Sequence, residues 1–153
     1  MTRRLAFSLM LFMTLAAGAA PAVHASVAGF LQSNQLHTLD QYVLWLGENI
    51  GYRSDDGAKE WADPETTLSR RYGDCKDYAL LNKEALRSFG YHADIYSVTY
   101  SDQTKHAITV FKVSGRYALI SNTELHVTDI ASWDEFTQYL LIEHGYFTPQ
   151  TVL

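Results

Sequence analysis

The segment that most constrains this chain is 71–79, Arg-Tyr-Gly-Asp-Cys-Lys-Asp-Tyr-Ala, which carries its single cysteine, Cys75. Gly73 breaks the preceding helix, and Asp74 is a good N-cap for a helix over residues 75–89. A thiol in the first turn lies at the positive end of the helix dipole, which favours the nucleophilic thiolate. The segment predicts a reactive cysteine, and the alternative is a buried thiol that acts as a small hydrophobic residue.

The pattern around this segment predicts an α+β fold with helices packed on a small antiparallel sheet. The expected helices are 36–52, capped by Thr38 or Asp40, then 63–71 with Asp63 and Pro64 at its start, and 132–144. The expected strands are 91–100, 106–113 and 116–121, joined by short polar turns into a meander.

The first 25 residues read as a secretory signal peptide, because Arg3 and Arg4 precede an apolar run that ends near Ala25. We expect cleavage after Ala25, one domain over residues 26–153, and a periplasmic or secreted monomer without stable membrane insertion. The formal net charge of −5 and the lack of a basic patch argue against a nucleic-acid partner.

Four groups could form a catalytic site. Cys75 is the candidate nucleophile, and His106, at the start of a predicted strand, is the candidate base. Ser121 and Asn122 end the neighbouring predicted strand, where a polar group could orient the imidazole. The unsatisfied N–H groups at the start of the Cys75 helix could hold an oxyanion.

Four stretches together resemble the transglutaminase-like superfamily, in particular the bacterial transglutaminase-like cysteine proteinases. They are Trp61-x-x-Pro64-x-x-Thr67-Leu68, 73–79, Gly90-Tyr91 and 106–110 (His-Ala-Ile-Thr-Val). The resemblance covers residues 43–122 and implies a papain-like fold with Cys75 as nucleophile and His106 as base. The family usually closes its triad with an aspartate, where this chain has Ser121, so Ser121 or Asn122 would have to take that role.

The resemblance also bears on substrate and metal. Trp61, Tyr72 and Asp74 are candidate substrate-binding residues; Trp61 and Tyr72 could instead be core residues, and Asp74 simply a helix cap. Calcium-dependent members carry an acidic residue after the cysteine, where Lys76 has the opposite charge. We therefore expect no metal and no other cofactor, with calcium as the alternative that Lys76 disfavours.

These features predict an exported cysteine hydrolase, a peptidase or amidase that forms a thioester acyl-enzyme on a protein or peptide substrate. A protein-crosslinking acyltransferase would use the same chemistry with a lysine amine in place of water. The missing aspartate favours a third alternative, a catalytically degenerate binding or adaptor module of the same fold.

Overall fold

The computed structural model describes residues 26–54 and 60–152 of the 153-residue chain. The expected signal peptide and the polar loop at Asp55 and Asp56 lie outside these ranges. The elements, in chain order, are α1 (Val27–Ser33), α2 (Leu39–Asn49), β1 (Gly51–Tyr52), α3 (Pro64–Arg70), β2 (Tyr72–Gly73), α4 (Cys75–Ser88), β3 (Ala93–Thr99), β4 (Lys105–Val113), β5 (Arg116–Ser121), β6 (Glu124–Val127), α5 (Trp133–His144) and β7 (Phe147–Thr151).

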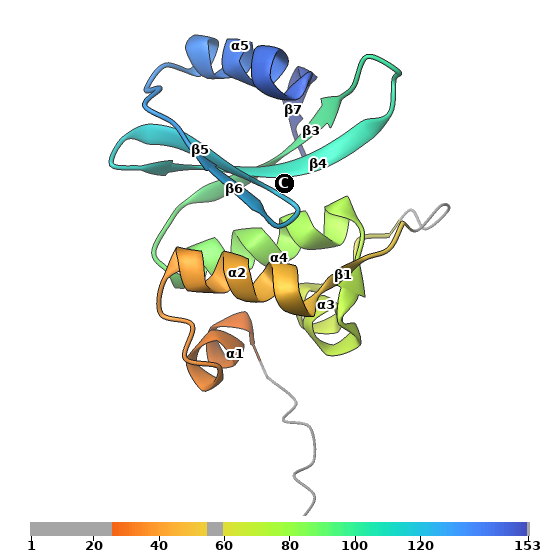
Figure 1. Ribbon diagram of the computed structural model, residues 1–153, viewed down its shortest axis with the longest axis vertical. Helices are drawn as coiled ribbons and strands as arrows, with labels where there is room; N and C mark the ends of the chain where they lie inside the picture. Colours follow the sequence, from red (N-terminus) through yellow and green to blue (C-terminus); the bar gives the residue numbers. More distant parts are fainter. Residues whose placement is uncertain (1–25, 55–59, 153) are drawn as a thin grey trace, which may run out of the picture.

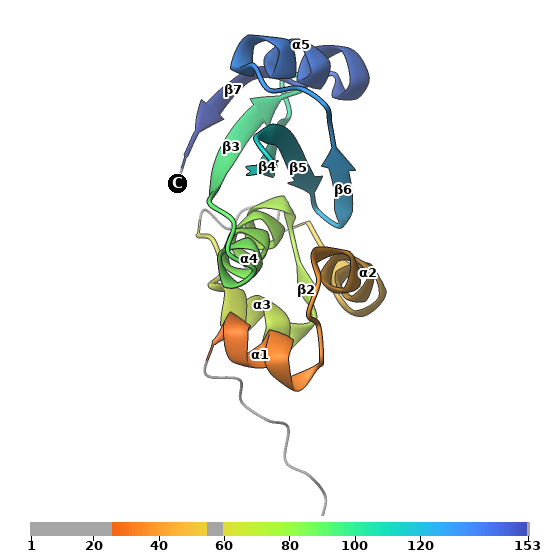
Figure 2. The same cartoon turned by 90° about the vertical axis from the view of Figure 1, so that its left-hand side faces the viewer.

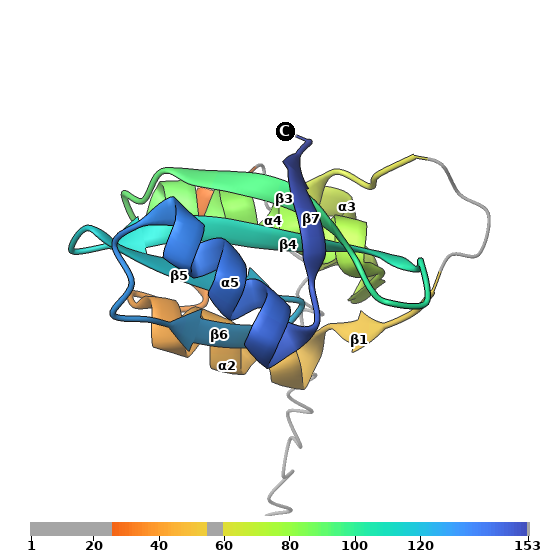
Figure 3. The ribbon, with the colours of Figure 1, turned by 90° about the horizontal axis from the view of Figure 1, so that it is seen from above.

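The main sheet has five strands in the order β6-β5-β4-β3-β7, and every neighbouring pair is antiparallel. Helix α4 packs on one face of the sheet, α1 and α3 pack against α4, and α5 crosses the opposite face (Figures 1 and 3). The side view separates these layers and shows α4 directly beneath the sheet (Figure 2). The predicted α+β class, with helices on a small antiparallel sheet, is confirmed.

The helix starts follow from local capping, and for that reason the sequence predicts them well. The Thr38 hydroxyl accepts a hydrogen bond from the N–H of Gln41, whose side chain bonds back to the N–H of Thr38. Asp63 caps α3 with Pro64 at the first helical position, and Ser132 caps α5. Gly145 ends α5 at a positive φ of 65°.

The end of α3 differs from the prediction. Arg71, at φ 62°, takes the left-handed position, and Gly73 instead lies in β2, which pairs with β1 in parallel. Glycine is required at position 73 because a Cβ there would lie 2.8 Å from the Cβ of Asp77. The sequence therefore marks a special backbone position correctly but assigns it the wrong cause.

The other strands and α1 show how far the sequence prediction reaches. The β3–β4–β5 meander is confirmed, whereas α1, β6 and β7 have no counterpart among the predicted elements. Strand β7 pairs with β3 at the sheet edge and contains Pro149, a residue tolerated only at strand edges. Because Tyr146 lies between Gly145 and the first residue of β7, this strand helps to fix where Tyr146 enters the fold.

The two faces of β4 enter different cores. Ile108 and Val110 join the cluster under α5, while Ala107 joins a cluster with Ala79 of α4. Thr109 faces α4, and its hydroxyl donates to the carbonyl of Ala79 at 3.1 Å. Successive strand residues point to opposite faces of a sheet. At the start of β4, His106 therefore lies on the α5 side and Ala107 on the α4 side. Over residues 26–54 and 60–152, no helix has the length and apolar character of a membrane span.

Candidate active site

Cys75 is the first residue of α4 and is half-buried against the sheet. With Trp61 and Leu80 it packs on the buried cluster of Ala79, Ile95 and Ala107. The Cys75 sulfur also accepts a hydrogen bond from the backbone N–H of Ala107, the residue that follows His106 in β4. The helix start is thus docked on the strand that carries the candidate base.

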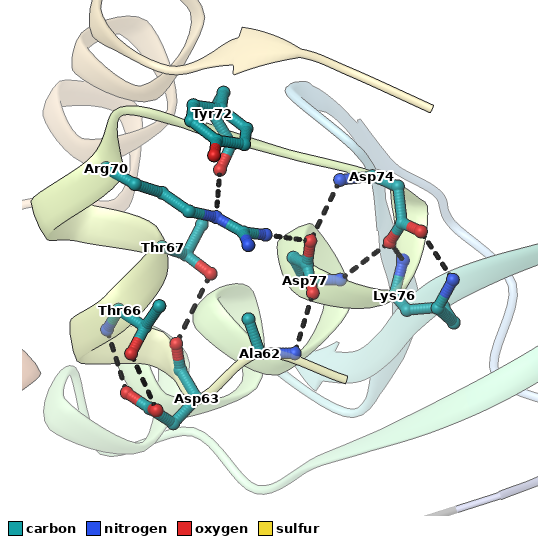
Figure 4. Close-up of polar contacts among 9 residues, drawn as sticks. All are labelled: Ala62, Asp63, Thr66, Thr67, Arg70, Tyr72, Asp74, Lys76 and Asp77. Carbon is teal, nitrogen blue, oxygen red and sulfur yellow. Dashed lines mark hydrogen bonds and ion pairs between the residues drawn. The ribbon is translucent and has the colours of Figure 1, made fainter. Parts of the chain in front are cut away.

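Charged side chains hold the start of α4 in place (Figure 4). Asp74 accepts hydrogen bonds from the N–H groups of Lys76 and Asp77, and its other oxygen pairs with the Lys76 ammonium. Asp77 accepts from the N–H groups of Ala62 and Asp74 and pairs with Arg70. This capping box joins α4, α3 and the segment before α3 into one unit.

The capping also decides which backbone donors remain at the helix start. The N–H groups of Lys76 and Asp77 are taken by the Asp74 side chain, and that of Tyr78 by the Asp74 carbonyl. The remaining first-turn N–H, that of Cys75, lies toward its own thiol. It is the one suited to meet an oxyanion that forms beside the sulfur.

The surroundings of the thiol raise its pKa. Burial raises the pKa of Cys75 above its ordinary value, and the Asp74 carboxylate raises it further. The N–H of Ala107 and the Lys76 ammonium act to lower it, but they do not overcome the burial. The sequence predicts a lowered thiol pKa from the helix dipole; in the structure the pKa is raised, and burial is the largest cause.

His106 lies at the start of β4, is only 9% exposed, and contacts Ser121. Its Nε2 lies 2.9 Å from the Ser121 Oγ, and Nδ1 is the other ring nitrogen. Burial lowers the pKa of His106, which keeps the imidazole neutral near pH 7. Burial therefore favours the uncharged form of both the candidate nucleophile and the candidate base.

Two tyrosines that the sequence did not single out complete this cluster. The Tyr146 hydroxyl lies 3.1 Å from the Ser121 Oγ, and the Tyr100 ring centroid is 6.0 Å from that of His106. Burial, and then a hydrogen bond with Tyr146, raise the pKa of Tyr100 well above its ordinary value. Tyr100 also interacts electrostatically with Cys75, which brings the thiol and the imidazole into one neighbourhood. No spacing links these tyrosines to Cys75 or His106 in the sequence.

Asn122 contributes through its backbone. It has a left-handed φ of 52°, and its carbonyl accepts a hydrogen bond from the Asn82 side chain at 2.9 Å. Asn82 accepts in turn from the Tyr42 hydroxyl, so α2 and α4 hold the turn after Ser121. Of the two candidates for orienting His106, Ser121 makes the contact to the ring, whereas the Asn122 Oδ1 is buried without a partner in the described part of the chain.

The three candidate substrate-binding residues separate in space. Trp61 packs in the Cys75 cluster, and Asp74 caps α4. Tyr72, 37% exposed, lies between the guanidinium groups of Arg53 and Arg70, 5.0 and 4.8 Å from its ring centroid. Arg53, Arg70 and Tyr72 line a surface pocket of about 320 Å³ on that side of Asp77. Of these three residues, Trp61 is the one that packs with Cys75 on the apolar cluster of Ala79, Ile95 and Ala107.

Comparison with known proteins gives one family. The sequence model of the transglutaminase-like domain matches residues 23–147. No curated protein sequence matches the chain.

Solved structures with the same fold include cysteine-protease relatives. A protein from Cytophaga hutchinsonii with a provisional cysteine-protease assignment has a TM-score of 0.51 and 18% identity over 69% of this chain and 40% of its own. LapG from Legionella pneumophila has a TM-score of 0.51 and 14% identity over 65% of this chain and 64% of its own. The chain thus spans less than two thirds of either protein, and these identities bear on the fold.

The comparison corrects the cofactor prediction. LapG has been solved in calcium-bound and EGTA-treated forms, the former with a TM-score of 0.52 to this chain. The expectation of no metal, based on Lys76, is therefore wrong: a domain of this fold holds calcium. The described residues do not themselves fit such an ion, because Asp74 and Asp77 are occupied by Lys76, Arg70 and backbone donors. Within 26–54 and 60–152, no three His, Cys, Asp or Glu residues are grouped to hold a metal.

Proposed function

The chain belongs to the transglutaminase-like domain family, and from this premise we propose that it is a cysteine peptidase or amidase that acts on a protein or peptide substrate through Cys75 and His106. The observation that carries the proposal is the docking of the Cys75 helix start on the strand of His106, with Ser121 on the far ring nitrogen. Nucleophile, base and orienting group then follow the logic of a catalytic triad.

The reaction begins from the neutral pair. His106 Nδ1 takes the proton of the Cys75 thiol as the sulfur attacks the substrate carbonyl carbon. The N–H of Cys75 donates to the oxyanion of the tetrahedral intermediate. The proton then passes from Nδ1 to the leaving amine, and a thioester remains. Water hydrolyses the thioester in a peptidase, and a lysine amine would attack it in a crosslinking enzyme.

The test is peptide turnover by the purified domain, with and without a fluorescent primary amine. New peptide ends that disappear in Cys75→Ala and His106→Ala support a peptidase, and amine incorporation with the same dependence indicates acyl transfer. Equal turnover in wild type and Cys75→Ala would refute the proposal. Ser69→Ala, an exposed change on α3, serves as the matched control.

A non-catalytic binding module is the second candidate. It is favoured by one observation: burial raises the pKa of Cys75 and lowers that of His106, and the contact on Nε2 is a neutral serine. Such a module would show no turnover, and Cys75→Ala would keep the affinity for its partner.

Calcium and export remain parts of the proposal with their own tests. For calcium, carried over from LapG, we would compare the melting temperature and Cys75 alkylation in excess calcium and after EGTA. No change in either would separate this chain from LapG. For export, the N-terminal sequence of the mature protein from the periplasm or medium should begin at Ser26.

A further inference from the structure

Ser121 sits between two groups that compete for its single hydrogen. The His106 Nε2 lies 2.9 Å from its Oγ, and the Tyr146 hydroxyl lies 3.1 Å away on the other side. A serine hydroxyl has one donor hydrogen and two acceptor lone pairs. If the hydrogen goes to Tyr146, a lone pair faces Nε2, and Nε2 must carry the ring hydrogen.

Tyr146 is held firmly enough to make this choice. It is 5% exposed, directly follows the left-handed Gly145 and precedes the edge strand β7. Its ring stacks on His144 with 5.2 Å between centroids, and the Tyr100 ring packs edge-on at 5.3 Å. The Tyr146 hydroxyl contacts Ser121 on one side and shares a hydrogen bond with Tyr100 on the other. The raised pKa of Tyr100 keeps that partner neutral, so no charged group takes part.

We propose that Tyr146 is a positioning residue that sets the tautomer of His106 through Ser121. Tyr146 accepts the Ser121 hydrogen, Ser121 accepts the Nε2 hydrogen, and Nδ1 keeps the lone pair that takes the Cys75 proton. This deepens the proposed function and rests on it for the role of Nδ1, but the tautomer can be measured on its own. Two hydroxyls thereby do the orienting work for which the related proteinases use an aspartate.

The structure also indicates what loss of the phenol would do. Without Tyr146 as acceptor, the nearest acceptor for the Ser121 hydrogen is Nε2 itself. The ring hydrogen would then move to Nδ1, which could no longer accept the thiol proton. Tyr146→Phe retains the ring that packs on His144 and Tyr100, so the change is confined to the hydrogen bonds of the hydroxyl with Ser121 and Tyr100.

The experiment is ¹⁵N NMR of the His106 side chain in the wild type and Tyr146→Phe, together with the rate of Cys75 acylation by a reactive peptide ester. We expect mainly the Nε2–H tautomer in wild type, a shift toward Nδ1–H in the variant, and acylation slower by about fivefold. Tyr139→Phe is the matched control, since it deletes a phenol hydroxyl that lies 3.2 Å from His144 Nε2 instead. It should leave the His106 tautomer unchanged.

A second set of variants tests whether Tyr146 acts on His106 through Ser121. Ser121→Ala should slow acylation as much as the double variant Ser121→Ala with Tyr146→Phe, because Tyr146 acts only through Ser121. An unchanged tautomer in folded Tyr146→Phe, additive effects in the double variant, or an Nδ1–H wild type would overturn the inference. If the tautomer shifts as expected but Cys75→Ala still turns over peptide, the proposed function fails while the tautomer assignment stands.

Discussion

The two halves of the candidate site are built from opposite kinds of chemistry. Around Cys75, Asp74 and Asp77 are paired with Lys76 and Arg70, and four charges are concentrated at one helix start. Around His106 the partners are hydroxyl groups and aromatic rings, all of them uncharged. Charge therefore secures the backbone that carries the nucleophile, while the base is oriented by neutral hydrogen bonds.

This contrast separates fixing a helix from activating a thiol. The Asp74 carboxylate that caps α4 also raises the pKa of Cys75, so the cap works against the thiolate. On the other half, no carboxylate of residues 26–54 and 60–152 acts on the imidazole, and burial lowers the pKa of His106. The site is stable as a structure and neutral at rest, and the substrate complex has to supply the conditions for proton transfer.

The largest expected effect comes from breaking the charged half. Asp77→Ala removes the acceptor of Arg70 and of two backbone N–H groups, and leaves these donors partly buried. Loss of one partner from a buried ion pair typically costs about 3–5 kcal/mol. We expect a fall of about 3 kcal/mol in the free energy of unfolding, measured by urea denaturation.

The control for that change is an exposed pair on the same helix. Glu84→Gln breaks the pair between Glu84 and Arg87 at the surface of α4 and should cost less than about 0.5 kcal/mol. Equal losses for the two variants would show that Asp77 is not a structural centre of the helix start.

The next prediction converts the neutral half into a charged one. Ser121→Asp places a carboxylate beside Nε2, and an opposite charge at this distance raises a histidine pKa by about 1–3 units. The pair should move toward imidazolium and thiolate. Alkylation of Cys75 by iodoacetamide at pH 7 should then become about tenfold faster or more, and NMR titration of His106 should show the raised pKa.

Ser121→Asn is the matched control, because it adds similar volume without charge. It should leave the alkylation rate near that of wild type or lower it. If both variants react alike, the orientation of the imidazole, and not its charge, limits the thiol.

The same contrast explains what the sequence could show. Asp63, Asp74 and Ser132 act on N–H groups within three residues, and the helices that they begin are predicted correctly. The contact of His106 with Ser121 follows from two adjacent strands of the meander. The groups that complete it, Tyr100 and Tyr146, come from a strand end and a short link after α5.

No local sequence pattern predicts where the link with Tyr146 lies, because its position depends on β7. That strand has no alternating pattern and contains Pro149. The raised pKa of Cys75 could not be predicted from the sequence for the same reason. The main cause of the shift is burial, and the helix start alone does not show that Cys75 packs in a cluster with Ala107 and Trp61.

A smaller effect tests how the charged half acts on the thiol. Lys76 lowers the pKa of Cys75 and offsets Asp74, so Lys76→Met should raise that pKa further. Because Lys76 is partly exposed and solvent screens its charge, we expect alkylation at pH 8 to slow only about twofold. Lys83→Met, about two turns further along α4, should leave the rate unchanged.

The smallest expected effect concerns stability against pH in the neutral half. Burial lowers the pKa of folded His106 below its unfolded value of about 6.5, so above that pH the residue is neutral in both states. As the pH falls below about 6.5 the unfolded chain binds the proton first, and the free energy of unfolding decreases until the folded pKa is passed. The curve of His106→Gln should be flatter in this window.

His144 titrates in the same direction, because burial and then His126 lower its pKa, so it remains as a background slope in both proteins. Only the difference between the two curves belongs to His106. Parallel curves would mean that the imidazole is as well solvated in the folded protein as in the unfolded chain, and the contrast between a charged and a neutral half would then rest on the hydrogen bonds alone.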